Sequence, residues 1–131
     1  MIIIDAKDLI SGRMATFVAK QALLGETIDI VNAEQAVISG TPAQVLARYK
    51  QRSSRGIPSK GPFLPRNPDM FLKRLIRNML PFKQDKGEKA FKRIKCHIGI
   101  PEEFKEKKII TLDSAQVSKL PNTRYITISR I

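Results

Sequence analysis

The chain of 131 residues has no tryptophan, one cysteine and one histidine. Its single thiol, Cys96, cannot form an internal disulfide, and no second Cys or His lies at the spacing of a structural zinc site. No apolar run comes near the roughly 20 residues that cross a bilayer. The opening residues, MIIIDAKD, lack the basic and apolar regions of a secretory signal, so we expect an intracellular protein.

The sequence also lacks the residue patterns that are typical of a catalytic site. His97 has no second catalytic group beside it, and the alternation of Ile94, Cys96 and Ile98 places it on a strand, where a hydrogen-bonded structural histidine is the simpler interpretation. Cys96 then faces the core as a small apolar residue. The turn in IDAKDLISGRMAT has one glycine where the dinucleotide fingerprint has three, and GxxxxGK[ST] is absent. The sequence therefore predicts neither a cofactor nor a small-molecule substrate.

Acidic residues are absent from one long segment, 35–68. The net charge of +12 comes from 24 basic and 12 acidic residues. Residues 1–34 hold 3 basic and 5 acidic side chains, residues 35–95 hold 15 and 3, and residues 96–131 hold 6 and 4. The middle segment therefore carries an excess equal to that of the whole chain. A solubilising surface is one interpretation, but a single-sign run of this length favours a polyanionic partner, with nucleic acid ahead of a membrane.

A strand–helix–strand unit is predicted at the start of the chain. Residues 1–4 and 27–31 are short β-branched runs typical of buried strands. Ser11 is expected to cap the helix between them and Gly25 to end it. The apolar face of this helix is formed by Met14, Phe17, Val18 and Leu24. A weaker strand is predicted at 36–38.

Two further helices begin with a cap residue followed by proline, at Thr41–Pro42 and Asn67–Pro68. The second is the clearest in the chain and is expected to end at Pro81. Between them, residues 53–66 are predicted to form an extended loop because five prolines and glycines interrupt them. A short basic helix at 86–93, the strand around His97, and two strands at 108–112 and 125–129 complete the prediction. The inner faces of the two proline-started helices are formed by Val45, Leu46 and Tyr49, and by Phe71, Leu72, Leu75, Ile76, Met79 and Leu80.

Basic side chains in and around the loop are the candidate binding residues. Arg48 and Arg52 lie one helical turn apart and lead into the loop, so the group can follow a phosphate backbone. Arg13, near a helix N-terminus, has two interpretations: a ligand for a single phosphate or a surface arginine beside a cap. No aromatic residues alternate with the cations, so we expect contacts with phosphates and folded shape more than with splayed bases. The predicted set is Arg13, Arg48, Lys50, Arg52, Arg55, Lys60, Arg66, Lys73, Arg74, Arg77 and Lys83.

Several blocks in the same order resemble one family. IDAKDLISGRMATFVAK, IVNAEQAVISG and PRNPDMFLKRLIRNMLPFKQDKGEKAFKRIKCHIGIP are similar to large-subunit ribosomal protein thirteen over residues 2–101. RSSRGIPSKGPFLPR looks like the archaeal and eukaryotic branch. Asn78 stands where the family typically has glycine. Asn is the next best residue for a left-handed turn, so we expect that turn to be kept.

The resemblance implies an α/β fold in three layers, with a central mixed sheet of about four strands flanked by helices. It also implies a structural role in the large ribosomal subunit in the cytoplasm, bound to ribosomal RNA and neighbouring ribosomal proteins and supporting subunit assembly, with no catalytic activity, no metal and no obligate homo-oligomer. We expect one domain, with a core of residues 1–50 and 67–100, a basic loop of 51–66 and an extension of 101–131. The alternatives are an RNA-modifying or nucleotide-using α/β enzyme and an RNA-binding module that acts outside the ribosome.

Overall fold

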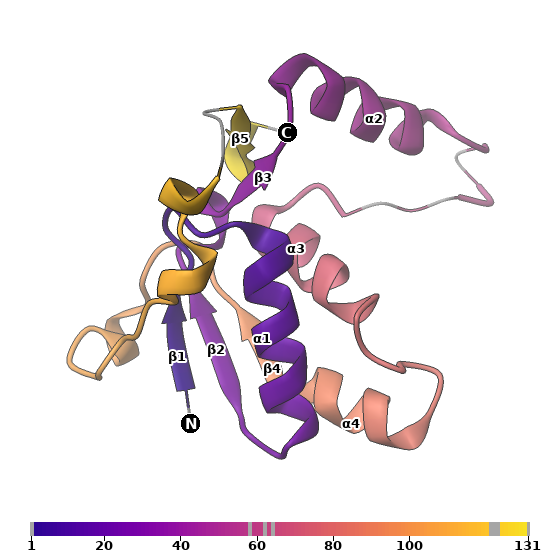
Figure 1. The fold of residues 1–131 in the computed structure, drawn as a ribbon. Helices are drawn as coiled ribbons and strands as arrows, with labels where there is room; N and C mark the ends of the chain where they lie inside the picture. Colours follow the sequence, from indigo (N-terminus) through magenta and orange to yellow (C-terminus); the bar gives the residue numbers. More distant parts are fainter. Residues whose placement is uncertain (1, 58, 62, 64, 121–123, 131) are drawn as a thin grey trace.

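The computed structural model describes residues 2–57, 59–61, 63, 65–120 and 124–130. Helices and strands alternate in the first part of the chain, and short 3-10 turns dominate the last part (Figure 1). The elements are β1 (Ile2–Asp5), α1 (Ser11–Leu23), β2 (Ile28–Val31), β3 (Val37–Ser39), α2 (Pro42–Ser54), α3 (Pro68–Arg77), α4 (Asp85–Lys92), β4 (Ile94–Cys96) and β5 (Tyr125–Thr127). The 3-10 turns are Ala33–Gln35, Glu102–Phe104, Asp113–Ala115, Val117–Lys119 and Ile128–Arg130.

A parallel sheet of three strands, in the order β1-β2-β4, forms the centre of the molecule. Ile2 is paired with Ile28, which is paired on its other side with Ile94. Every residue of β2 is buried because strands flank it on both sides and other elements cover its faces. The parallel β1–β2 pair with α1 between the two strands in sequence confirms the predicted strand–helix–strand unit.

Opposite faces of this sheet contact different parts of the chain. Side chains alternate along a strand, so Ile4 and Ile3 point to opposite faces of the sheet. Ile4 belongs to the main core cluster, which includes buried residues of α1, α3 and α4. Ile3 instead packs in a second cluster with Val31 and Phe104. The segment after β4 therefore covers the face of the sheet that the helices leave free.

The described residues form two small sheets where the sequence predicts one mixed sheet of about four strands. β3 pairs antiparallel with β5, which joins Ile38 to Ile126, and this pair is separate from the parallel sheet. The predicted strand at 108–112 is reduced to one parallel bridge between Ile110 and Ile4. The α/β class is confirmed, but β3 takes its strand partner from near the C-terminus and so does not join β2.

Several helix ends differ from the prediction. Ser11 is the first residue of α1, whose cap position is Ile10, and no side chain caps the helix. Leu24 is 70% exposed, because α1 ends at Leu23 and Gly25 turns the chain away at φ 103°. Helix α2 continues to Ser54, so the extended segment begins at Arg55 instead of Ser53.

Helix α3 ends at Arg77, four residues before Pro81. Asn78 follows it with φ −68° and ψ −15°, which is right-handed helical backbone. The expectation of a left-handed turn at Asn78 is therefore wrong. The chain instead passes through further turns as far as Lys83 and enters α4, where Gly87 lies directly against the carbonyl of Pro81. Among the described residues, no helix is long and apolar enough to cross a membrane.

Candidate nucleic-acid interface

Helix α2 presents most of its surface to solvent. Val45 is its one buried residue, and β3 leads into the helix at the edge of the molecule (Figure 1). Arg48, Lys50 and Arg52 are exposed along it. The guanidinium carbon of Arg52 lies 5.3 Å from the ring centroid of Tyr49, a cation–π distance that leaves its charge available. The helix thus exposes three cations within five residues.

The segment after α2 continues this exposed charge. Arg55, Lys60 and Arg66 are exposed, and a tight turn brings the amide of Gly61 to 2.9 Å from the carbonyl oxygen of Ile57. Gly61 has φ 84°, a left-handed value that side chains rarely adopt. We call residues 42–66, comprising α2 and this segment, the basic arm. In Figure 1 the arm extends away from the parallel sheet and returns to the start of α3.

The cations of α3 are held differently. Lys73, Arg74 and Arg77 are half-buried, while Lys83 beyond the helix is exposed. The ammonium nitrogen of Lys73 lies 4.7 Å from the ring centroid of Phe91 on α4. Aromatic faces attract cations without neutralising them, so this contact fixes the direction of the ammonium group and keeps its charge.

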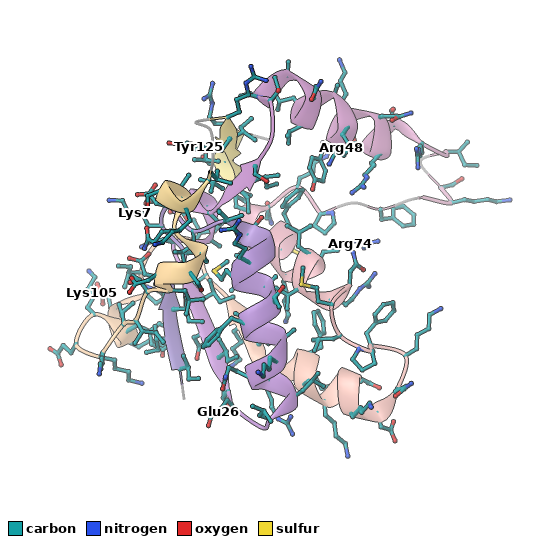
Figure 2. The ribbon with its side chains drawn as sticks, viewed as in Figure 1. Lys7, Glu26, Arg48, Arg74, Lys105 and Tyr125 are labelled. Carbon is teal, nitrogen blue, oxygen red and sulfur yellow. The ribbon has the colours of Figure 1, made fainter. Side chains whose placement is uncertain are left out.

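Arg77 is the most constrained of these cations. Its guanidinium carbon lies 4.7 Å from the ring centroid of Phe82. Its Nε is buried and has no hydrogen-bond partner among the described residues. Figure 2 shows Arg74 on α3 on the same side of the molecule as Arg48 on α2. A basic groove of about 290 Å³ beside α3 is lined by Pro65, Met70, Lys73, Arg74, Arg77 and Phe91.

Arg13 lies apart from the other predicted cations. It is exposed near the start of α1, and its Nη1 donates a long hydrogen bond of 3.4 Å to the carbonyl oxygen of Ser114. This contact joins α1 to the C-terminal part of the chain and favours a structural role for Arg13. The phosphate-binding interpretation of Arg13 stays a prediction.

Among the residues that the structure describes, no carboxylate pairs with one of the predicted cations. Within the described part of the chain, ion pairs join Lys92 to Glu88 and His97 to Asp29, and neither pair includes one of the eleven predicted residues. The arm itself contains no acidic residue, so its charge is of one sign. Such a surface has a strong electrostatic attraction for a polyanion.

His97 and Cys96 have structural surroundings. His97 Nε2 lies 3.1 Å from Oδ1 of the buried Asp29, and its ring packs against Phe104 at a centroid distance of 5.3 Å. The interpretation of His97 as a hydrogen-bonded structural histidine is confirmed. Burial raises the pKa of the Cys96 thiol to about 12, so this half-buried side chain is protonated at neutral pH and is a poor nucleophile. Among the described residues, no three His, Cys, Asp or Glu side chains gather as metal ligands.

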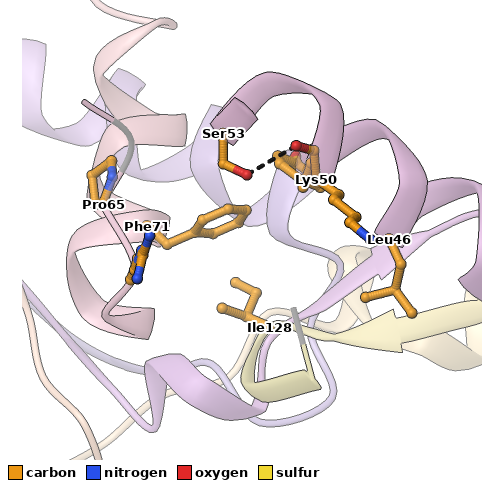
Figure 3. Close-up of a pocket in the computed structure, with 8 residues that line it drawn as sticks. Leu46, Lys50, Ser53, Pro65, Phe71 and Ile128 are labelled. Atoms are coloured by element: carbon orange, nitrogen blue, oxygen red, sulfur yellow. Dashed lines mark hydrogen bonds between the residues drawn. The ribbon is translucent and has the colours of Figure 1, made fainter. Parts of the chain in front are cut away.

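An aromatic pair that the sequence pattern does not indicate lies at the base of the arm. The rings of Tyr49 and Phe71 meet edge to face, with centroids 4.9 Å apart and an interplanar angle of 62°. These residues are far apart in sequence, so only the return of the chain along α2 brings them together. They line a cavity of about 410 Å³ together with Leu46, Lys50, Ser53, Pro65, Arg66 and Ile128 (Figure 3).

Comparison with known proteins identifies the family. The model of the family described as ribosomal protein L13 matches residues 1–103. The chain belongs to this family. Its relatives include proteins named large ribosomal subunit protein uL13 from three archaea. The protein of Methanosarcina barkeri is 46% identical over 132 residues, that of Methanococcoides burtonii 41% over 131, and that of Methanocaldococcus jannaschii 42% over 135.

These matches cover 100% of this chain and 94% of each relative. The family model ends within the 3-10 turn at Glu102–Phe104, whereas the archaeal relatives align through β5 as well. The family resemblance over residues 2–101 is therefore confirmed. The tail beyond Phe104 is shared with the archaeal L13 relatives.

Proposed function

We propose that this member of the L13 family is a structural constituent of the large ribosomal subunit in the cytoplasm, where it binds ribosomal RNA. The observation that carries the proposal is its full-length similarity to archaeal proteins named for the large subunit. The family is structural and not enzymatic. An RNA-modifying activity is therefore not proposed.

The RNA contact is proposed to be mainly with phosphates. Arg48, Arg52 and Arg55 expose guanidinium groups, which match phosphate oxygens in a two-pronged geometry. Each phosphate that the arm neutralises releases condensed counterions, and this release drives binding. The proposed contact set is the eleven cations predicted from the sequence, with Arg13 the least supported because of its contact with Ser114.

The two groups of cations are proposed to make different kinds of contact. Those of the arm are exposed and lie on a segment with little buried surface, so RNA orders them when it binds. Lys73 and Arg77 lie over aromatic rings and are half-buried, so they offer a preformed surface, whereas Arg52 lies over Tyr49 but is exposed. A preformed surface loses less conformational entropy on binding. The α3 surface would thus dock first and the arm would follow, supporting subunit assembly.

The partners of this single-domain chain are proposed to be the large-subunit RNA and neighbouring ribosomal proteins, without a membrane or an obligate second copy. Sedimentation of a cell lysate tests the assignment. The native protein is expected to run with large subunits on a gradient, and a protein that ran free of them in the lysate would refute the structural role and favour an RNA-binding module acting elsewhere.

Salt dependence tests the phosphate contacts. With about 6 to 10 phosphates neutralised, affinity for large-subunit RNA is expected to fall about 10³- to 10⁵-fold between 50 and 200 mM salt. Filter binding of the purified chain over this range measures the slope. An affinity that does not change with salt would exclude phosphates as the main ligands.

A further inference from the structure

The cavity beside Tyr49 has the lining of a binding site for a flat aromatic group. Its volume of about 410 Å³ falls in the range of about 300 to 1,000 Å³ in which proteins hold small-molecule groups. Tyr49 and Phe71 supply two half-buried rings, and Leu46 and Ile128 supply aliphatic walls. Figure 3 shows Phe71 pointing from α3 toward Ser53 and Lys50 on α2. The rings are too close for a base to enter between them, so an occupant packs against the pair.

Cations border the same cavity. Lys50 and Arg66 line it, and no acidic side chain is among the lining residues. Lys50 also accepts, through its backbone carbonyl, a 2.9 Å hydrogen bond from the hydroxyl of Ser53. The site thus combines aromatic and aliphatic walls with two positive charges at separate points of its lining. One nucleotide matches this arrangement because it carries a flat base and a phosphate.

We propose that one unpaired nucleotide of the ribosomal RNA inserts its base into this cavity, against Tyr49 and Phe71, with its phosphate held by Lys50 and Arg66. The inference rests on the proposed function and deepens it, because the arm then binds an unpaired base as well as the phosphate backbone. Single-stranded nucleotides of RNA are commonly recognised by stacking on aromatic side chains. An apolar side chain of a neighbouring protein would fill the walls but leave both cations without a counter-charge.

Replacing the tyrosine ring tests the base contact. Tyr49→Leu keeps an apolar wall but removes one of the two rings against which the base packs, so affinity for full-length large-subunit RNA is expected to fall about 5- to 150-fold. The salt slope of binding is expected to stay unchanged, because no cation is removed. Tyr125→Leu is the matched control. Tyr125 is the other tyrosine of the chain, lies on β5 and does not line the cavity.

Filling the cavity gives a second test that removes no aromatic ring. Ser53→Leu places an aliphatic side chain in the space for the base, and affinity is expected to fall about tenfold or more. Ser54→Leu is its control on the same helix. Ser53 and Ser54 are both exposed and each bonds a carbonyl three residues earlier, at 2.9 and 3.0 Å, but only Ser53 lines the cavity.

The outcomes separate the two proposals. Circular dichroism first establishes that each variant retains the fold. If the original chain binds RNA with the expected salt slope but neither Tyr49→Leu nor Ser53→Leu weakens binding, the base site is refuted and the proposed function stands. If Tyr49→Leu binds weakly and the salt slope of binding also decreases, the base site is refuted as well, because the substitution would then have weakened phosphate contacts. If the original chain does not bind ribosomal RNA, both proposals fail.

Discussion

Helices α1 and α2 each contain 13 residues, yet they have opposite relations to the rest of the molecule. Six residues of α1 are buried, and the helix contacts β2, α3 and α4. One residue of α2 is buried, and its main contact is with β5. The difference follows from the side chains. Helix α1 buries alanines and larger apolar residues, whereas α2 buries only Val45 and exposes Arg48, Lys50 and Arg52.

This contrast separates the helix that stabilises the fold from the helix that we propose binds RNA. Burial of α1 contributes to stability through apolar surface removed from water. The arm contributes little of this kind, and its unpaired cations repel one another in the free protein. A bound polyanion would supply the negative charge that the arm lacks. The two helices should therefore respond differently to substitution.

Removal of arm charge is expected to give the largest effect. The triple variant Arg52→Ala, Arg55→Ala and Lys60→Ala loses three charge-assisted contacts, so affinity for large-subunit RNA should fall by about 10³-fold or more. The salt slope should decrease by about 2 to 3 units. The melting temperature should remain close to that of the original chain because all three residues are exposed. Filter binding and thermal denaturation measure the two quantities.

A variant with the same change of net charge outside the eleven residues is the control for this triple variant. Lys105→Ala, Lys108→Ala and Lys119→Ala remove three exposed cations of the C-terminal part. We expect a smaller loss of affinity. Equal losses in the two triple variants would mean that RNA affinity depends on the total charge of the chain and not on where the cations lie.

Truncation of one apolar residue in each helix tests the comparison directly. Met14 on α1 is 0% exposed, and Met14→Ala should lower the free energy of unfolding by about 2 to 5 kcal/mol through the cavity it leaves. Leu46 on α2 is 41% exposed, and Leu46→Ala should change it by about 0.5 kcal/mol or less. Urea denaturation measures both. Similar values for the two variants would show that α2 is part of the stabilising core.

A substitution in α4 tests how tightly the core is packed. An added Cβ at Gly87 would overlap the backbone carbonyl of Pro81, so Gly87→Ala should cost about 1 to 3 kcal/mol of stability. Gly12→Ala is the control in α1. Apart from its chain neighbours and the backbone of its own helix, its Cβ would have no atom within 4 Å, and the change should stabilise the chain by about 0.4 to 1 kcal/mol. Destabilisation by both variants would contradict the steric explanation.

A small effect is expected at the end of α3. Asn78 has right-handed backbone, so glycine offers no conformational advantage there. Asn78→Gly should lower the free energy of unfolding by about 0.5 kcal/mol because it adds flexibility to the unfolded chain. Calorimetry of the two proteins measures the difference. An increase in stability would show that this position favours a left-handed turn after all.

Local features of the sequence predict the first half of the fold well. The apolar runs at β1 and β2, Gly25 at a positive φ, and the prolines that start α2 and α3 are each determined by neighbours in sequence. Long-range features could not be predicted in the same way. The partner of β3 is β5, and three-residue strands have too weak a pattern to specify a register across that distance.

In the candidate site, too, local features could be predicted from the sequence and long-range contacts could not. Charge counting locates the basic arm, because a run without acids is visible in the sequence alone. It does not show that Lys73 and Arg77 lie over Phe91 and Phe82, since those contacts depend on how the chain turns between α3 and α4. Nor does it show the pair of Tyr49 with Phe71, which depends on the path of the whole segment between them. Composition predicts the partner, and the tertiary structure is needed for the form of the contact.

The pairing of β3 with β5 has a consequence for the order of events during synthesis. Proteins begin to fold from the N-terminus while they are still being made. All three strands of the parallel sheet lie within residues 2–96, so they leave the ribosome before Tyr125 does. The strand that carries α2 acquires its antiparallel partner only afterwards. The orientation of the basic arm is thus fixed last, when the folded remainder of the chain is already in place.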